Sequence, residues 1–160
     1  MMPDPLVIEV ADELGTERFA ASLAAVLPER VVISLSGTLG AGKTRFVKAL
    51  AAAAGVDPLA VTSPTFVLIQ EYAGDRPIFH FDVYRLRDED EFLALAPEEY
   101  FDRPGWTILE WGERFARCLP PDRLDISIDV TGPTSRQFKV QGHGSDNATC
   151  VGRLRNAIAP

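Results

Sequence analysis

The sequence predicts an α/β fold, a three-layer domain around a mixed sheet that contains both parallel and antiparallel strands. One sign is an apolar strand at residues 31–36, which runs through a glycine-rich loop into a helix. Another is a pair of strand-like segments, residues 65–72 and 78–82, that a short turn separates, as in an antiparallel hairpin. At 160 residues, the chain suits one ordinary domain with a sizeable core. We expect that domain over residues 1–141, followed by a weakly anchored C-terminal tail over residues 142–160.

The composition of the chain argues against some classes of function. The chain has a net charge of −7 and is 46% hydrophobic, as in a soluble globular protein. The negative charge argues against broad, unaided binding to nucleic acid, which needs a basic surface. Cys118 and Cys150 lack metal-ligand spacing, which favours reduced structural thiols. There is no signal-peptide pattern and no apolar run near the roughly 18 residues that span a membrane, so we expect a cytoplasmic protein.

The N-terminal elements follow from patterning and capping. Residues 6–10 form a short strand, and Asp12 can cap the helix that follows. Pro28 stops that helix, whose apolar face we assign to Leu14, Phe19, Leu23, Val26 and Leu27. The strand at residues 31–36 is nearly all apolar, as expected for a central strand covered on both faces.

The loop after this strand matches G-x-x-x-x-G-K-[ST], the P-loop (Walker A) pattern, and therefore predicts a P-loop NTPase-like domain. Its glycines allow backbone N–H groups to cradle phosphate oxygens at the positive end of a helix. The lysine would reach the terminal phosphates, and the threonine hydroxyl would bind Mg²⁺. The residues are Gly37, Thr38, Leu39, Gly40, Ala41, Gly42, Lys43 and Thr44.

The remaining elements are short. We expect an acidic helix at residues 88–95, a helical turn at 97–101, a strand at 106–110 and a short helix at 113–118. Residues 124–130 and 138–141 read as a closing hairpin. From residue 142 the chain is rich in Gly, Ser and Asn and then only weakly amphipathic, which suggested the tail.

A P-loop also needs an acidic residue near the cation, usually at the end of a neighbouring apolar strand. Glu110, after an apolar run, and Asp82, after another, both qualify. Hydroxyl groups of the Thr62-Ser63-Pro64-Thr65 segment either reach the γ-phosphate or cation, as switch segments do, or satisfy local backbone groups.

Five further residues are also candidates. His80 reads as a packed strand residue more than as a catalyst. Trp111 packs either near the nucleotide or in the core, and Arg136 reaches a nucleotide or is a solvated charge. Tyr84 and the adjoining Arg85 position either the site or a partner.

The choice of nucleotide rests on a missing signal. Guanine-reading proteins carry an N-K-x-D segment, and this chain has none. The D-x-x-G at residues 102–105 precedes its strand instead of closing one, so we interpret it as a turn. ATP is therefore favoured over GTP.

Four segments together resemble the TsaE (YjeE) family, the small ATPases of bacterial tRNA threonylcarbamoyladenosine synthesis. They are the P-loop, Ser63-Pro64-Thr65-Phe66, His80-Phe81-Asp82-Val83-Tyr84-Arg85-Leu86 and Leu109-Glu110-Trp111. Their order and spacing match over most of residues 12–136. Thr38 departs from the family, which commonly has Asp there.

The resemblance implies a cofactor set and partners. The chain would bind ATP or ADP with Mg²⁺ and hydrolyse ATP, slowly when alone. It would support TsaD-like and TsaB-like proteins in placing threonylcarbamoyl beside the tRNA anticodon, with indirect contact to the tRNA. Thr44 and Glu110 match the family's Mg²⁺ ligands, Asp82 an essential carboxylate and Trp111 a residue near the nucleotide. Asp12, Glu13 and Arg136 match positions that line the nucleotide.

Two other functions stay open. One is a small-metabolite kinase, whose lid arginines would come from the pairs at 85 and 87 or at 114 and 117. The other is a nucleotide-gated binding module that needs ATP occupancy without hydrolysis. The acidic residues 88–91, 98 and 99 form either a solvated face or a docking surface for a basic partner.

Overall fold

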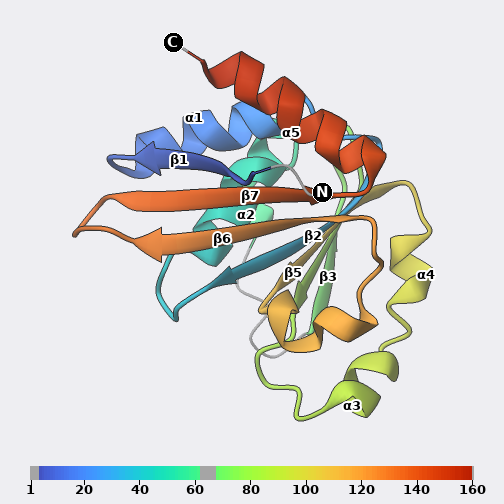
Figure 1. The fold of residues 1–160 in the computed structure, drawn as a ribbon. Helices are drawn as coiled ribbons and strands as arrows, with labels where there is room; N and C mark the ends of the chain where they lie inside the picture. Colours follow the sequence, from blue (N-terminus) through green and yellow to red (C-terminus); the bar gives the residue numbers. More distant parts are fainter. Residues whose placement is uncertain (1–3, 62–67, 160) are drawn as a thin grey trace.

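The computed structural model describes residues 4–61 and 68–159 and contains one seven-stranded sheet in that part of the chain. The strand order is β1-β7-β6-β2-β5-β4-β3 (Figure 1). The strands are β1 (Leu6–Val10), β2 (Arg30–Gly37), β3 (Ile69–Tyr72), β4 (Ile78–Asp82), β5 (Gly105–Glu110), β6 (Arg123–Val130) and β7 (Arg136–His143). Strands β6, β2, β5 and β4 run parallel, whereas β3, β7 and β1 pair antiparallel with their neighbours. The predicted mixed sheet is confirmed.

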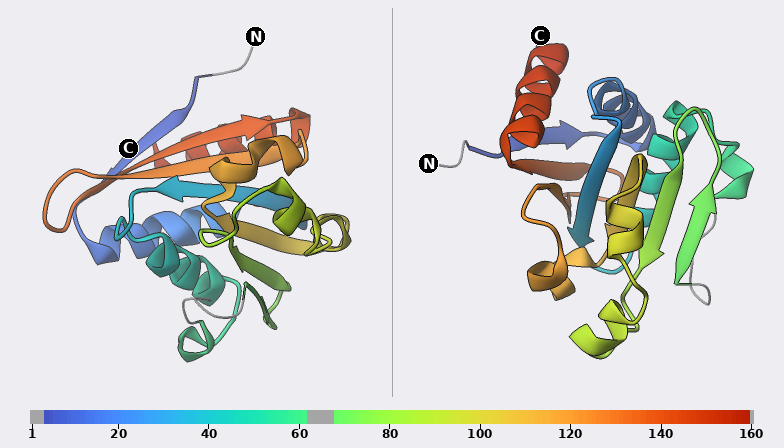
Figure 2. Two further views of the ribbon diagram at one scale, coloured as in Figure 1. Left: turned by 90° about the horizontal axis from the view of Figure 1, so that it is seen from below. Right: turned by 90° about the vertical axis from the view of Figure 1, so that its right-hand side faces the viewer.

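Helices lie on both faces of the sheet (Figure 2). On one face, α1 (Glu13–Ala24), α2 (Lys43–Ala53) and α5 (Ser145–Ile158) cover the larger core. On the other, α3 (Glu89–Leu93), α4 (Glu98–Phe101) and the 3₁₀ helix η2 (Gly112–Cys118) cover a smaller one. A 3₁₀ turn, η1 (Pro58–Ala60), follows α2. The result is three layers, as predicted.

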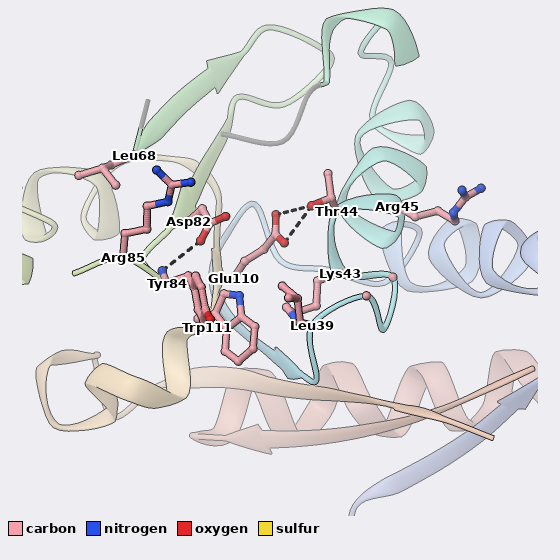
Figure 3. Close-up of a pocket in the computed structure, with 12 residues that line it drawn as sticks. Leu39, Lys43, Thr44, Arg45, Leu68, Asp82, Tyr84, Arg85, Glu110 and Trp111 are labelled. Atoms are coloured by element: carbon pink, nitrogen blue, oxygen red, sulfur yellow. Dashed lines mark hydrogen bonds between the residues drawn. The ribbon is translucent and has the colours of Figure 1, made fainter. Parts of the chain in front are cut away.

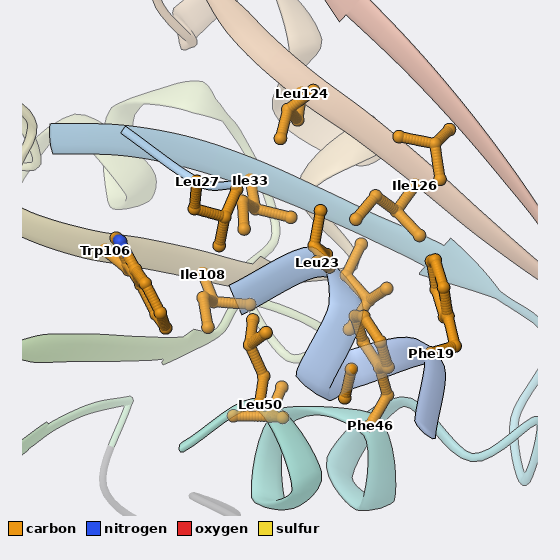
Figure 4. Close-up of a cluster of buried hydrophobic side chains, with 14 of the residues drawn as sticks. Phe19, Leu23, Leu27, Ile33, Phe46, Leu50, Trp106, Ile108, Leu124 and Ile126 are labelled. Atoms are coloured by element: carbon orange, nitrogen blue, oxygen red, sulfur yellow. The ribbon is translucent and has the colours of Figure 1, made fainter. Parts of the chain in front are cut away.

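The larger core fixes α2 against the central strands. Phe19 of α1 stacks on Phe46 of α2, with ring centroids 5.6 Å apart, and both contact Phe138 of β7. Figure 4 shows these helices meeting Ile33, Ile108 and Ile126 on the sheet. Burial of this many large apolar side chains is the main driving force for the fold. It also fixes the N-terminus of α2 at the end of β2, where the P-loop lies.

The hairpins and caps mostly agree with the sequence analysis. Strands β3 and β4 pair antiparallel, as do β6 and β7. The Asp12 carboxylate accepts the Gly15 N–H and caps α1. Leu14, however, is 52% exposed, so its place on the apolar face was wrong. Residues 65–67 of the predicted strand at 65–72 lie outside the described residues.

The C-terminal segment differs from the expected tail. Strand β7 continues to His143, and α5 then packs on the sheet with Cys150, Val151 and Leu154 buried. Since these side chains belong to the larger core, residues 145–158 are part of the folded unit. Among the described helices, none is long and apolar enough to cross a membrane.

Candidate nucleotide-binding site

The P-loop joins β2 to α2, and its backbone needs glycine. Gly42 is the N-cap of α2 with a φ of 105°, in the left-handed region that other residues adopt only with strain. At Gly37, with a φ of 153°, a Cβ atom would lie 2.8 Å from the carbonyl oxygen of Ile128. Lys43 and Thr44 occupy the first turn of α2, whose free N–H groups and dipole favour an anion.

Lys43 reaches back over the loop. Its ammonium donates to the carbonyl oxygens of Gly37, at 2.7 Å, and Thr38, at 2.9 Å. It also lies 4.0 Å from the centroid of the Trp111 ring. Burial lowers the pKa of Lys43, and the negative charges of Glu110, Glu113 and Asp82 oppose that shift. The Lys43 ammonium is therefore surrounded by hydrogen-bond acceptors, in the place where the loop would hold phosphate.

Thr44 and Glu110 meet at the base of the loop. The Thr44 hydroxyl lies 3.0 Å from each carboxylate oxygen of Glu110 and donates to that group (Figure 3). Glu110 ends β5 and is only 3% exposed. One hydroxyl and one carboxylate suit Mg²⁺, which takes few protein ligands and keeps water and phosphate oxygens. In the described part of the chain, no group of three or more His, Cys, Asp or Glu side chains forms a denser metal cluster.

Asp82 ends β4 and pairs in register with Glu110 on β5. Its Oδ1 accepts the backbone N–H of Tyr84 at 3.0 Å, which fixes the turn after the strand. Burial raises the pKa of Asp82, and the nearby Glu110 carboxylate adds to this, while the Tyr84 N–H, His80 and Lys43 act against it. The two predicted carboxylates therefore lie side by side at the carboxyl ends of neighbouring parallel strands.

These groups line a cavity of about 440 Å³. Figure 3 shows side chains from the P-loop, α2, β4 and β5 around it. Its lining comprises Leu39, Gly40, Gly42, Lys43, Thr44, Arg45, Leu68, Asp82, Tyr84, Arg85, Glu110 and Trp111.

A second cavity, of about 210 Å³, lies on the other side of the same loop. Glu13, Gly40, Ala41, Gly42 and Arg136 contribute to its lining. The Arg136 Nε donates to the Ala41 carbonyl oxygen at 3.0 Å, so this side chain braces the loop from the opposite side. A ligand bound by the P-loop thus has room on both sides of it.

The family model for "Threonylcarbamoyl adenosine biosynthesis protein TsaE" matches residues 10–138. The chain belongs to the TsaE family. Two proteins named tRNA threonylcarbamoyladenosine biosynthesis protein TsaE illustrate the similarity. The one from Aquifex aeolicus is 44% identical over 132 residues, covering 80% of this chain and 90% of the relative. The one from Bacillus subtilis is 40% identical over 131 residues, covering 81% of each.

A solved structure has the same fold. The crystal structure of Bacillus subtilis YdiB superposes with a TM-score of 0.80 at 29% identity, covering 98% of this chain and 97% of that one. The P-loop α/β architecture expected of the family is therefore present over nearly the whole chain.

Most candidate residues of this TsaE-family site come together, with three exceptions. Thr65 lies outside the described residues. Asp12 lines neither of these two cavities and serves as the cap of α1. Gly37 also lines neither cavity, although its carbonyl oxygen accepts from the Lys43 ammonium. Leu39 does line the larger cavity and, being 77% exposed, lies at its rim.

The sequence analysis did not predict a set of Arg114 hydrogen bonds beside the site. Arg114 of η2 donates from its Nη1 to the carbonyl oxygens of Val83, at 3.1 Å, and Tyr84. Glu113, beside it, faces Lys43, and burial raises the pKa of this carboxyl. The sequence offered Arg114 only as one member of a kinase lid. Its hydrogen bonds were not predictable, because their acceptors are backbone atoms about thirty residues away.

Proposed function

We propose that this protein binds Mg-ATP on its P-loop, hydrolyses it slowly when alone, and supports formation of threonylcarbamoyladenosine in tRNA. The observation that carries the proposal is the contact of the Thr44 hydroxyl with the Glu110 carboxylate, next to Lys43 at the N-terminus of α2. By family membership, its partners would be TsaD-like and TsaB-like proteins, with tRNA contacted indirectly.

Each residue has a defined task in this proposal. Loop N–H groups and Lys43 would bind the β- and γ-phosphates, and Thr44 and Glu110 would hold Mg²⁺. The bound cation would neutralise charge that develops on the phosphate oxygens. Asp82, or a hydroxyl of residues 62–65, would orient the attacking water. Little covalent chemistry is required of the protein, so positioning and electrostatics dominate.

The nucleoside would extend toward the second cavity. Glu13 and Arg136 line that cavity, and Trp111 lies over Lys43 in the first. Because no N-K-x-D segment is present to read guanine, ATP is the proposed nucleotide and ADP the product.

Turnover of purified variants tests the proposal. We expect Lys43→Ala, Glu110→Gln and Asp82→Asn each to reduce ATP hydrolysis at least tenfold, with and without TsaD-like and TsaB-like proteins. Arg153→Ala, on the exposed side of α5, is the matched control. Wild-type rates in all three site variants would overturn the assignment.

Cellular depletion tests the pathway separately. Loss of threonylcarbamoyladenosine from tRNA on depletion, with rescue by the wild-type gene, would support the role. Rescue by an Asp82→Asn protein that binds but does not hydrolyse ATP would identify a nucleotide-gated module instead. Unchanged modification on depletion would exclude this pathway.

Three of the four arginines that a kinase lid would use have partners elsewhere. Arg114 is bound to backbone carbonyl oxygens, Arg117 pairs with Glu89, and Arg87 pairs with Glu91. Of the two arginine pairs that the sequence offered, only Arg85 lines the larger cavity.

A further inference from the structure

A row of polar side chains crosses the sheet behind the site. The Tyr72 hydroxyl on β3 lies 3.0 Å from Nδ1 of His80 on β4. The opposite ring nitrogen of His80, Nε2, lies 2.5 Å from Oε2 of Glu110 on β5. Glu110 in turn accepts from the Thr44 hydroxyl on α2. The row therefore connects three neighbouring strands to the first turn of the P-loop helix.

Strand register places this row on one face. His80 pairs with Gln70 on β3 and with Ile108 on β5, and Glu110 follows two residues after Ile108. Side chains at paired and alternate positions share a face of the sheet, here the one that α2 covers. The apolar members of that face, such as Ile78 and Ile108, belong to the larger core.

Burial makes the row costly. His80 is fully buried, and Glu110 and Tyr72 are 3% and 6% exposed. Removing such groups from water is unfavourable unless hydrogen bonds compensate, and an apolar set of similar volume would avoid that cost. A purely structural role therefore does not explain why an acid and an imidazole occupy the middle of an apolar layer.

The geometry limits the freedom of the Glu110 carboxylate. Oε2 faces the His80 ring while both oxygens face Thr44, so rotation of the carboxylate would break contacts on two sides. The ring itself is held at both nitrogens, because Tyr72 contacts Nδ1 and donates onward to Gln70 at 2.5 Å. Such supporting hydrogen bonds commonly orient metal ligands and set metal affinity.

We propose that His80, braced by Tyr72, is a positioning residue that orients the Glu110 carboxylate for a cation shared with Thr44. The inference rests on the proposed Mg-ATP function and adds a determinant of cation affinity to it. His80 itself touches neither nucleotide nor cation, since Glu110 lies between the ring and the cavity.

Calorimetric binding of a non-hydrolysable ATP analogue tests the role, with titrations in Mg²⁺ and in EDTA. The ratio of the two affinities measures the contribution of the cation. We expect His80→Leu to lower this ratio about tenfold or more while the affinity in EDTA stays near wild type. His80→Gln, which keeps an N–H donor, should recover most of the ratio.

Tyr72→Phe provides a variant that fills the same space. It removes one hydroxyl from a side chain outside the larger cavity, and we expect a smaller fall of the ratio in the same direction. Equal losses in Mg²⁺ and EDTA, or no loss in either, for folded His80→Leu and Tyr72→Phe would overturn the inference. Wild-type protein that binds no analogue under either condition would instead overturn the proposed function.

Discussion

At the residue scale, Trp111 has the most constrained backbone of the site. Its φ of 68° and ψ of 25° place a bulky residue in the left-handed region, which costs on the order of 1–2 kcal/mol. The conformation turns the chain from β5 into η2 and presents the indole to Lys43 and Tyr84. Strain of this kind persists where the surroundings hold it in place, here the tilted Tyr84 ring and the Lys43 ammonium.

We expect nucleotide binding to change tryptophan fluorescence. Phosphate would draw the Lys43 ammonium away from its position 4.0 Å from the Trp111 ring centroid and so alter emission. The chain has only two tryptophans, and the other, Trp106, is 1% exposed in the core. Stopped-flow or steady-state emission would detect the change.

Trp111→Phe is the control for this measurement, because it leaves Trp106 as the sole fluorophore. The response to nucleotide should disappear in that variant while the protein stays folded. An equal response in both proteins would show that Lys43 and Trp111 do not report occupancy.

Prediction from sequence placed side chains correctly where a general rule specifies the position, while their roles stay predictions. Glu110 and Asp82 were found because carboxylates at strand ends beside a P-loop suit a cation, and the structure brings both to the cavity. His80 was read as a packed residue. Its partners, Tyr72 and Glu110, are defined only by strand register, which a single sequence does not specify.

At the element scale, two roles for Asp12 can be told apart at the start of α1: capping the helix and contacting the nucleotide. Its carboxylate accepts the Gly15 N–H at 2.9 Å, as an N-cap does. We expect Asp12→Ala to lower the free energy of unfolding by about 1 kcal/mol, whereas Asp12→Asn, an equally good cap, should stay near wild type. Urea unfolding would measure both.

The same pair of variants tests nucleotide contact. If Asp12 only caps α1, the affinity for ATP should be unchanged in Asp12→Asn. A large loss of affinity in Asp12→Asn, with stability intact, would show that the negative charge acts on the ligand.

Helix α5 shows where the sequence misled. Gly142, Gly144, Ser145 and Asn147 cluster as in a loop, which suggested a loose tail. In the structure, a Cβ atom at Gly142 would lie 2.6 Å from the Asn147 carbonyl oxygen, so this glycine allows the first turn of α5 to cross β7 closely. The cluster therefore marks a close contact between β7 and α5. The apolar positions after it form a buried stripe along α5.

We expect Leu154→Ala to destabilise the protein by about 2–5 kcal/mol, since this side chain is fully buried. A truly loose tail would give no change. Thermal or urea unfolding measures the effect, and exposed Arg153→Ala on the same helix is the matched control. Equal stability of the two variants would contradict the packing of α5.

Cys150 on the same helix gives a pH dependence. Burial raises the pKa of its thiol to about 11, whereas an unfolded cysteine has a pKa of ~8.5. Between these values the folded state keeps the proton and the unfolded state loses it. Stability should therefore fall as pH rises, by about 1 kcal/mol per pH unit, with no contribution below pH ~8.

Cys150→Ala isolates this contribution from other groups that titrate in alkali. Urea unfolding from neutral pH to pH ~10.5 should show a shallower decline in the variant than in the wild type. Parallel declines would mean that the folded state does not hold the Cys150 proton.

At the scale of the whole molecule, strand order builds the site. Strand β5 lies between β2 and β4, so the P-loop after β2 meets Glu110 and Asp82 at one edge of the sheet. The β3–β4 and β6–β7 hairpins were predictable from their turns, because two strands joined by a short connection pair antiparallel. The parallel order of β6, β2, β5 and β4 depends on long-range packing, which local patterns do not encode.

Because the site joins elements from much of the chain, ligand binding should stabilise the whole fold. At a hundredfold excess over its dissociation constant, Mg-ATP should add about 2.7 kcal/mol to the free energy of unfolding. For a chain of 160 residues that corresponds to a rise in Tm of roughly 5–10 °C.

Lys43→Ala should lose most of this shift, and Mg²⁺ alone should produce little of it, because the cation has only Thr44 and Glu110 as close protein ligands in the proposed site. Calorimetric scans of both proteins with Mg-ATP, Mg²⁺ and buffer make the comparison. A wild-type Tm that Mg-ATP leaves unchanged would mean that the P-loop, despite its geometry, does not bind the nucleotide.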